Sequence, residues 1–229
     1  MKVSISPEVF KEFHPQLRIA FILIKGINNH KNLRESEHLL KEGEELARME
    51  FHPETLKNHN LIAPWVAAQK EFGSKAKHYH TSVERLLQNV LHKKSITAKD
   101  TLTNLINYLS LQHVVPIGVD DLKKIKGNLH FELSKGKDKV HLLARIKKGA
   151  FIYRDNSGVI GTKFDYWKSV RTAVDKETKS ALIHLEVVPP LTKKELEDIM
   201  IEMQSLIDSF CGGKSKVFIL DRNCPSCEI

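Results

Sequence analysis

The first half of the chain carries hydrophobic residues mainly at intervals of three and four positions, the spacing of amphipathic helices. This spacing predicts helices over residues 7–13, 32–50, 64–73, 82–91 and 99–113. Residues 17–27 break the pattern because their sequence, LRIAFILIKGI, is almost continuously apolar. We therefore expect a strand there that is buried on both faces and ends at the turn signals of residues 26–29.

The second half changes to short apolar runs separated by turn residues, the pattern of antiparallel strands. These runs predict strands over residues 130–133, 140–146, 150–154, 158–164, 181–188 and 216–220. A long helix is predicted over residues 191–210, since Thr192 and Glu195 fit a capping box and Gly212 follows its end.

The order of these elements favours an α+β fold because the helices and strands segregate rather than alternate. We expect a helical N-terminal part packed on a mixed or barrel-like sheet of short strands. Residues 1–222 form a single domain in this interpretation, and residues 223–229 form a loose C-terminal tail.

Residues 107–122, NYLSLQHVVPIGVDDL, join the two halves. We interpret them as the end of one helix, a Pro-Gly turn and the start of a second helix. Thr103, Asn107 and Ser110 lie on a stripe of the first helix that is separate from its apolar stripe. This polar stripe either lines a cavity or forms a wet outer face.

Composition adds a positive charge to this picture. The net charge of +8 and the pI near 9.3 favour a polyanionic partner, and a merely solvated basic surface is an equal alternative. No stretch reads as a signal peptide or a membrane span, so we expect a cytoplasmic protein. Cys224 and Cys227 make up only half of a zinc site. We expect neither a metal nor a cofactor.

One segment combines aromatic and basic side chains: Lys163 precedes FDYWKSVRT, residues 164–172. Aromatic rings stack on unpaired bases while cations contact phosphates. We therefore predict an RNA-binding surface made of Lys163, Tyr166, Trp167, Lys168 and Arg171. The alternative is an aromatic corner packed in the core with its cations outside.

Several motifs follow one another in an order that resembles a known family. They are PWVAAQKEFG, NYLSLQHVVPIGVDDL with KKIKGNLHFEL, GVIGTKFDYWKSVRTAVDKETKSALIHLE and SFCGGKSKVFILD. Together they resemble the tRNA-editing domain of the phenylalanyl-tRNA synthetase beta subunit (the B-three/B-four domain), and especially free-standing proteins built from that domain. The resemblance is strongest over residues 64–221. It implies an α+β fold, RNA association and a pocket that hydrolyses wrongly attached tyrosine from tRNA, without ligase activity.

The residues of that editing pocket carry over only in part. The family's Asn is present as Asn107, but the Thr before it is replaced by Ile106. The family's His two residues after the Pro is replaced by Gly118, and a later Glu is replaced by His184. Glu186 lies two residues further along the same predicted strand, so it shares a face with His184.

Three interpretations of this pocket stay open. In a catalytic site, His184 is the base, Glu186 accompanies it and Asn107 donates to the oxyanion. The substrate then contacts Ser110, Gly118 and Ile106. In a binding site, the same groups hold a ligand without activating water. In the third interpretation, His184 is an ordinary histidine on a wet strand face.

The leading hypothesis is a protein that binds tRNA or aminoacyl-tRNA and hydrolyses mischarged aminoacyl-tRNA in trans. The chain has no Gly-rich phosphate loop, no GxSxG elbow and no HExxH motif, which removes the commonest nucleotide-dependent and hydrolase classes. Two rival hypotheses are a non-catalytic module that binds a free amino acid or another small ligand, and an RNA-binding remnant without a functional pocket.

Overall fold

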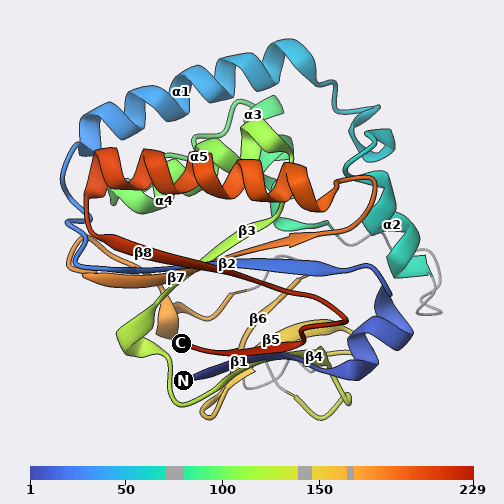
Figure 1. Ribbon diagram of the computed structural model, residues 1–229. Helices are drawn as coiled ribbons and strands as arrows, with labels where there is room; N and C mark the ends of the chain where they lie inside the picture. The colour runs from blue at the N-terminus through green and yellow to red at the C-terminus, as the bar shows by residue number, and fades with distance from the viewer. Residues whose placement is uncertain (71–79, 139–145, 164–167) are drawn as a thin grey trace.

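The computed structural model describes residues 1–70, 80–138, 146–163 and 168–229, and it stacks helices on two sheets (Figure 1). The helices over one face of the first sheet are α1 (Leu33–Glu50), α3 (Ser82–Leu91), α4 (Thr101–His113) and α5 (Lys193–Cys211). The remaining helical segments are η1 (Val9–Phe13), η2 (Leu56–Asn58), α2 (Ala63–Lys70), η3 (Leu122–Lys124) and η4 (Val170–Thr172). No helix within these described ranges is long and apolar enough to cross a membrane.

The first sheet has the strand order β3-β7-β2-β8, and the second has the order β6-β5-β4-β1-β9. The strands are β1 (Lys2–Ile5), β2 (Arg18–Lys25), β3 (Ile117–Asp121), β4 (Leu129–Leu133), β5 (Phe151–Asp155), β6 (Gly158–Thr162), β7 (Ser180–Val187), β8 (Lys214–Leu220) and β9 (Ser226–Glu228). β1 and β4 are parallel, whereas β4 and β5 are antiparallel. The expected α+β fold with a mixed sheet is confirmed, and neither sheet closes into a barrel over the described residues.

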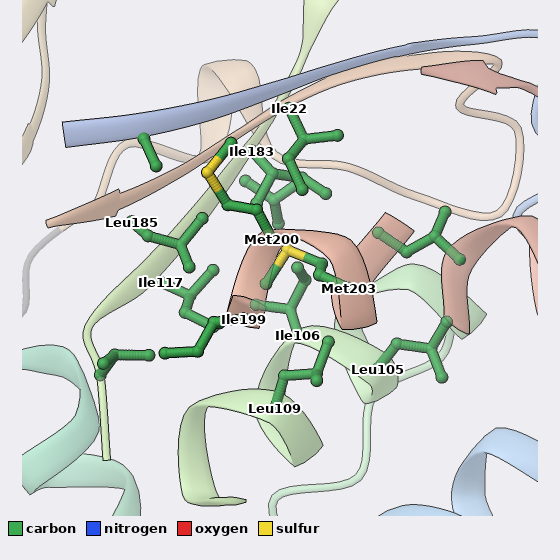
Figure 2. Close-up of a cluster of buried hydrophobic side chains, with 14 of the residues drawn as sticks. Ile22, Leu105, Ile106, Leu109, Ile117, Ile183, Leu185, Ile199, Met200 and Met203 are labelled. Atoms are coloured by element: carbon green, nitrogen blue, oxygen red, sulfur yellow. The ribbon is translucent and has the colours of Figure 1, made fainter. Parts of the chain in front are cut away.

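β2 is the buried centre of the first sheet, as its apolar run predicts. Ile22 pairs with Ile183 of β7 and packs toward α4 and α5, in the core shown in Figure 2. Phe21 points to the other face and meets Phe131 of the second sheet, with ring centroids 5.6 Å apart. Side chains alternate across a strand, so one face of β2 packs against the helices and the other packs against the second sheet.

The predicted second helix after the Pro-Gly turn is wrong. Residues 117–121 form β3, which pairs with β7 so that Ile117 lies opposite Leu185 and Val119 opposite Ile183. The side chains of Ile117 and Val119 both belong to the core that the helices cover. Pairing with a central strand therefore overrides the Asp-Asp-Leu helix signal, and only the short turn η3 remains helical.

The predicted loose tail is wrong as well. β9 pairs antiparallel with β1, with Val3 opposite Cys227, and the Met1 amino group donates to the Ile229 carbonyl at 3.1 Å. Both chain ends therefore lie together at the edge of the second sheet (Figure 1). The strand predicted over residues 140–146 lies almost entirely outside the described residues.

Candidate functional site

A cavity of about 220 Å³ lies where β3, β7 and α4 meet β5 and β6 of the second sheet. α4 contributes Ile106 and Asn107 to its wall, β3 contributes Gly118, and β7 contributes His184 and Glu186. The structure thus brings five of the six predicted catalytic and substrate residues to one cavity. Their chemical roles stay predictions.

His184 points between the two sheets because it alternates with Ile183 and Leu185, which face the helices. Its side chain is 1% exposed. The rings of Phe131 and Tyr153 approach the imidazole edge-on, with centroid distances of 5.6 and 5.0 Å. The interpretation of His184 as a histidine on a wet strand face is therefore wrong.

Glu186, His184 and Lys163 form a buried ionic cluster at the floor of the cavity. Glu186 Oε1 lies 2.7 Å from His184 Nδ1 and 2.5 Å from Lys163 Nζ, and Lys163 Nζ lies 3.0 Å from His184 Nδ1. The Glu186 side chain is 2% exposed, and that of Lys163 is 9% exposed. The Lys163 ammonium also lies 4.4 Å from the centre of the Tyr153 ring.

Burial and charge act in opposite directions on these groups. Burial would raise the pKa of Glu186, but the nearby Lys163 and His184 outweigh it and hold that pKa below its usual range. Burial lowers the pKa of the Lys163 ammonium, and attraction to Glu186 offsets part of that effect. Glu186 is therefore an ionised acceptor at neutral pH and a weak base.

Asp120 forms a second ion pair directly beside this cluster. Its Oδ1 lies 3.0 Å from Lys168 Nζ and accepts a 2.6 Å hydrogen bond from Thr172. Burial would raise the pKa of Asp120, but Lys168 and His184 bring it well below its usual range. Asp120 Oδ2 is 3.4 Å from His184 Nε2, and neither atom has a hydrogen-bond partner within the described part of the chain.

This arrangement does not suit His184 as a general base. Nδ1 is taken by Glu186 and Lys163, while Nε2 is buried against Asp120. A base needs one ring nitrogen within hydrogen-bond reach of a water molecule in the cavity. We assign His184 a positioning role, in which it fixes the carboxylate of Glu186.

The three residues of the polar stripe on α4 lie in two different surroundings. Thr103 and Asn107 line the cavity, and the Asn107 amide donates to the Ile96 carbonyl at 3.0 Å. Ser110 is buried elsewhere and donates to the Val115 carbonyl at 2.7 Å, where it closes the end of the helix. Ser110 therefore does not line the cavity, and its contact with substrate stays a prediction.

The basic residues of the predicted RNA surface are held by carboxylates. Lys163 is buried on Glu186, which removes it from any surface. Lys168 and Arg171 are partly exposed, and Arg171 makes a two-pronged ion pair with Asp155 at 2.8 Å. Tyr166 and Trp167 lie outside the described residues.

Sequence reasoning missed Asp120 as a member of the site and misassigned Lys163. The misplaced helix over residues 117–122 hid the strand alternation that puts Asp120 and Gly118 on the same face of β3. A strand interpretation of IGVDD would have pointed to Asp120. No group of three or more His, Cys, Asp or Glu side chains within the described ranges is arranged to hold a metal ion.

Comparison of the sequence with models of protein families identifies the family of this chain. Residues 65–208, more than half of the 229, match the model of the B3/4 domain. The chain belongs to the B3/4 domain family. The resemblance predicted from the motifs is confirmed at this level, and the matched residues of this B3/4 protein include most of the cavity wall.

Among solved structures, the B3/4 protein is similar to an N-terminal fragment of the phenylalanyl-tRNA synthetase beta subunit from Pyrococcus horikoshii. The TM-score is 0.44 at 10% identity, and the match covers 94% of this chain and 49% of that one. This chain therefore spans about half the length of that fragment. No curated protein sequence matches it significantly.

Proposed function

We propose that this B3/4 protein binds aminoacyl-tRNA, receives the aminoacyl group in the cavity beside His184 and hydrolyses the ester in trans. The observation that carries the proposal is the convergence of Asn107, Lys168 and Glu186 on one cavity in a B3/4 domain. A cavity of about 220 Å³ suits a group of amino-acid size better than a large cofactor.

In the proposed hydrolytic step, Glu186, Asn107 and Lys168 act on the water and the ester, and His184 does not. The ionised Glu186 orients a water molecule toward the ester carbonyl. Asn107 and Lys168 donate to the oxygen on which negative charge develops. Water adds to the carbonyl carbon, the ester bond breaks, and the terminal ribose oxygen of the tRNA leaves with a proton, giving a free amino acid and uncharged tRNA.

The net charge of +8 supports the tRNA part of the proposal, because exposed lysines contact the phosphates of a nucleic acid. Three lysines that can make such contacts are exposed on the surface: Lys123, Lys126 and Lys148. Binding through such contacts weakens steeply as salt rises.

The test is a panel of tRNAs, each charged with one amino acid, incubated with the purified protein. We expect at least one ester to be cleaved faster than in buffer alone, and charged tRNA to bind at low salt and dissociate as salt rises. The proposal is overturned if no ester is cleaved and no tRNA binds.

A second candidate is a module that binds a free amino acid without hydrolysis. The observation that favours it is the pairing of Glu186, the carboxylate in the cavity wall, with Lys163, and of the adjacent Asp120 with Lys168, which leaves no strong base. Thermal stabilisation by an amino acid, combined with the absence of salt-sensitive tRNA binding, would select this candidate.

A further inference from the structure

We infer that the free edge of β8, together with α5, binds an extended segment of a partner protein in which acidic side chains alternate with apolar ones. The segment adds to the sheet as a new strand beside β8. This surface lies apart from the cavity, because β3 and β8 stand at opposite ends of the strand order β3-β7-β2-β8. The inference is therefore independent of the proposed function.

β8 is an edge strand whose outer backbone groups are available to another chain. It pairs with β2 along residues 214–220 and has no strand on its other side among the described residues. Residues 214–217 are all exposed. An edge of this kind presents a row of N–H and C=O groups that a strand of another chain can complete.

Three lysines gather on one face of this edge. Phe21 and Leu23 of β2 pack into the core between the sheets, so strand alternation puts Lys25 on the same face. Lys214 lies opposite Lys25, and Lys216 lies opposite Leu23. All three lysines are exposed, and none has an ion pair with a residue that the structure describes. Like charges opposite each other destabilise a sheet, and an acidic partner relieves that repulsion.

The other face of the edge is apolar and lies beside α5, which runs along β8 (Figure 1). Gln204 of α5 donates to Ser215 Oγ at 2.8 Å, which places that side of the helix against the strand. Val217 shares the face of Ser215 and is 40% exposed, and Ile201, three residues before Gln204, is 64% exposed. A hollow of about 320 Å³ beside Ile201 and Ser215 can receive a side chain.

The charges select the order of side chains in the partner. Carboxylates on alternate residues meet Lys214 and Lys216, and they point away from Asp208, which is exposed on the α5 side. Apolar side chains on the intervening residues meet Val217 and Ile201. A second copy of β8 fits less well, since it brings two more lysines to the same edge. A nucleic acid meets the lysines but leaves the backbone edge and the apolar face unused.

The test uses a capped synthetic peptide of alternating glutamate and valine, and it follows the amide NMR signals of the isotope-labelled protein. We expect saturable shifts confined to residues 214–220, to their neighbours in β2 and to the part of α5 around Ile201. A peptide of the same composition, with its glutamates and valines in two separate blocks, should bind more weakly because it cannot match both faces.

Two further peptides separate strand addition from simple attraction of charge. A strand turns the N–H groups of alternate residues toward opposite sides. N-methylation of one alternate set should weaken binding about tenfold or more, because the donors to β8 are lost, whereas N-methylation of the other set should be tolerated.

A pair of matched variants tests the lysines. Lys214→Glu combined with Lys216→Glu should abolish binding of the alternating peptide. Lys57→Glu combined with Lys94→Glu makes the same change of charge at exposed residues outside α5 and the first sheet, and it should preserve binding.

The inference is overturned if the alternating peptide shows no saturable binding at millimolar concentration, if its shifts lie outside this edge, or if both N-methylated peptides bind equally well. It is also overturned if uncharged tRNA shifts the signals of residues 214–220 and the peptide does not, since the surface then belongs to nucleic acid. These comparisons use the natural protein, so they stand even if the charge-reversed variant does not fold.

Discussion

Gly118 lies directly opposite His184 in the β3–β7 pair, and the imidazole ring rests on the bare backbone of the glycine. A Cβ at position 118 would collide with the ring, and His184 Cε1 would be the nearest atom. The residues at positions 118 and 184 are therefore sterically coupled. The absent side chain at 118 leaves the space that the histidine at 184 occupies.

The first prediction concerns this coupling. Gly118→Ala should destabilise the fold by about 1–3 kcal/mol, because it overpacks a rigid interior. In a chain that already carries His184→Ala, the same exchange should cost much less, since the ring is gone. Urea unfolding of the four proteins of this cycle measures the effect. Equal costs in both backgrounds would show that the ring does not fill this space.

The second prediction tests the buried ion pair. Lys163→Met should destabilise the fold by about 3–5 kcal/mol, because it leaves the Glu186 carboxylate buried without its cation. Adding Glu186→Gln to that variant should restore part of the loss, since the unpaired charge is then removed. Guanidinium unfolding gives both values. A harmless single exchange would contradict the burial of this pair.

The third prediction is a loss of stability in acid. The pKa values of Asp120 and Glu186 are lowered in the folded state, so the unfolded chain binds protons first as the pH falls. The stabilisation is complete well above pH ~4 and disappears as the pH drops through the folded-state values. Asp120→Asn should flatten the curve of unfolding free energy against pH between about 5 and 3. An unchanged slope would contradict the assignment.

The fourth prediction concerns the C-terminal strand. Removal of residues 223–229 deletes β9 and exposes the edge of β1. Amide hydrogen exchange should then accelerate in residues 2–4, whereas exchange in β2, at the centre of the other sheet, should change little. Equal protection of β1 in both proteins would mean that the tail is not paired.

The sequence predicted those elements whose local and tertiary preferences agree. The capping box of Thr192 and Glu195 fixes the start of α5, and the apolar run at 17–27 becomes β2. β3 was missed because its strand identity depends on pairing with β7, 60 residues or so away, which no local pattern records. The tail was missed for the same reason, since its strand identity depends on pairing with β1 at the other end of the chain.

The candidate site was predictable wherever strand alternation or the family motif decided it. Alternation placed His184 and Glu186 on one face, and the motif brought Asn107, Ile106 and Gly118 to the same wall. Charge partners were not predictable. Nothing local indicates that Lys163 pairs with Glu186 or Lys168 with Asp120, so these lysines were assigned to an RNA-binding surface.

The most direct test of the account compares charged and uncharged tRNA for binding to the natural protein and to Val174→Trp. Val174 lies in the cavity wall, so the indole should fill the space for the aminoacyl group. Val170→Trp is the matched control, because residue 170 is 89% exposed. We predict that the natural protein and the control prefer, and cleave, at least one charged tRNA, whereas Val174→Trp loses both properties and still binds uncharged tRNA. Equal binding of charged and uncharged tRNA by the natural protein, with every ester left intact, would contradict the account.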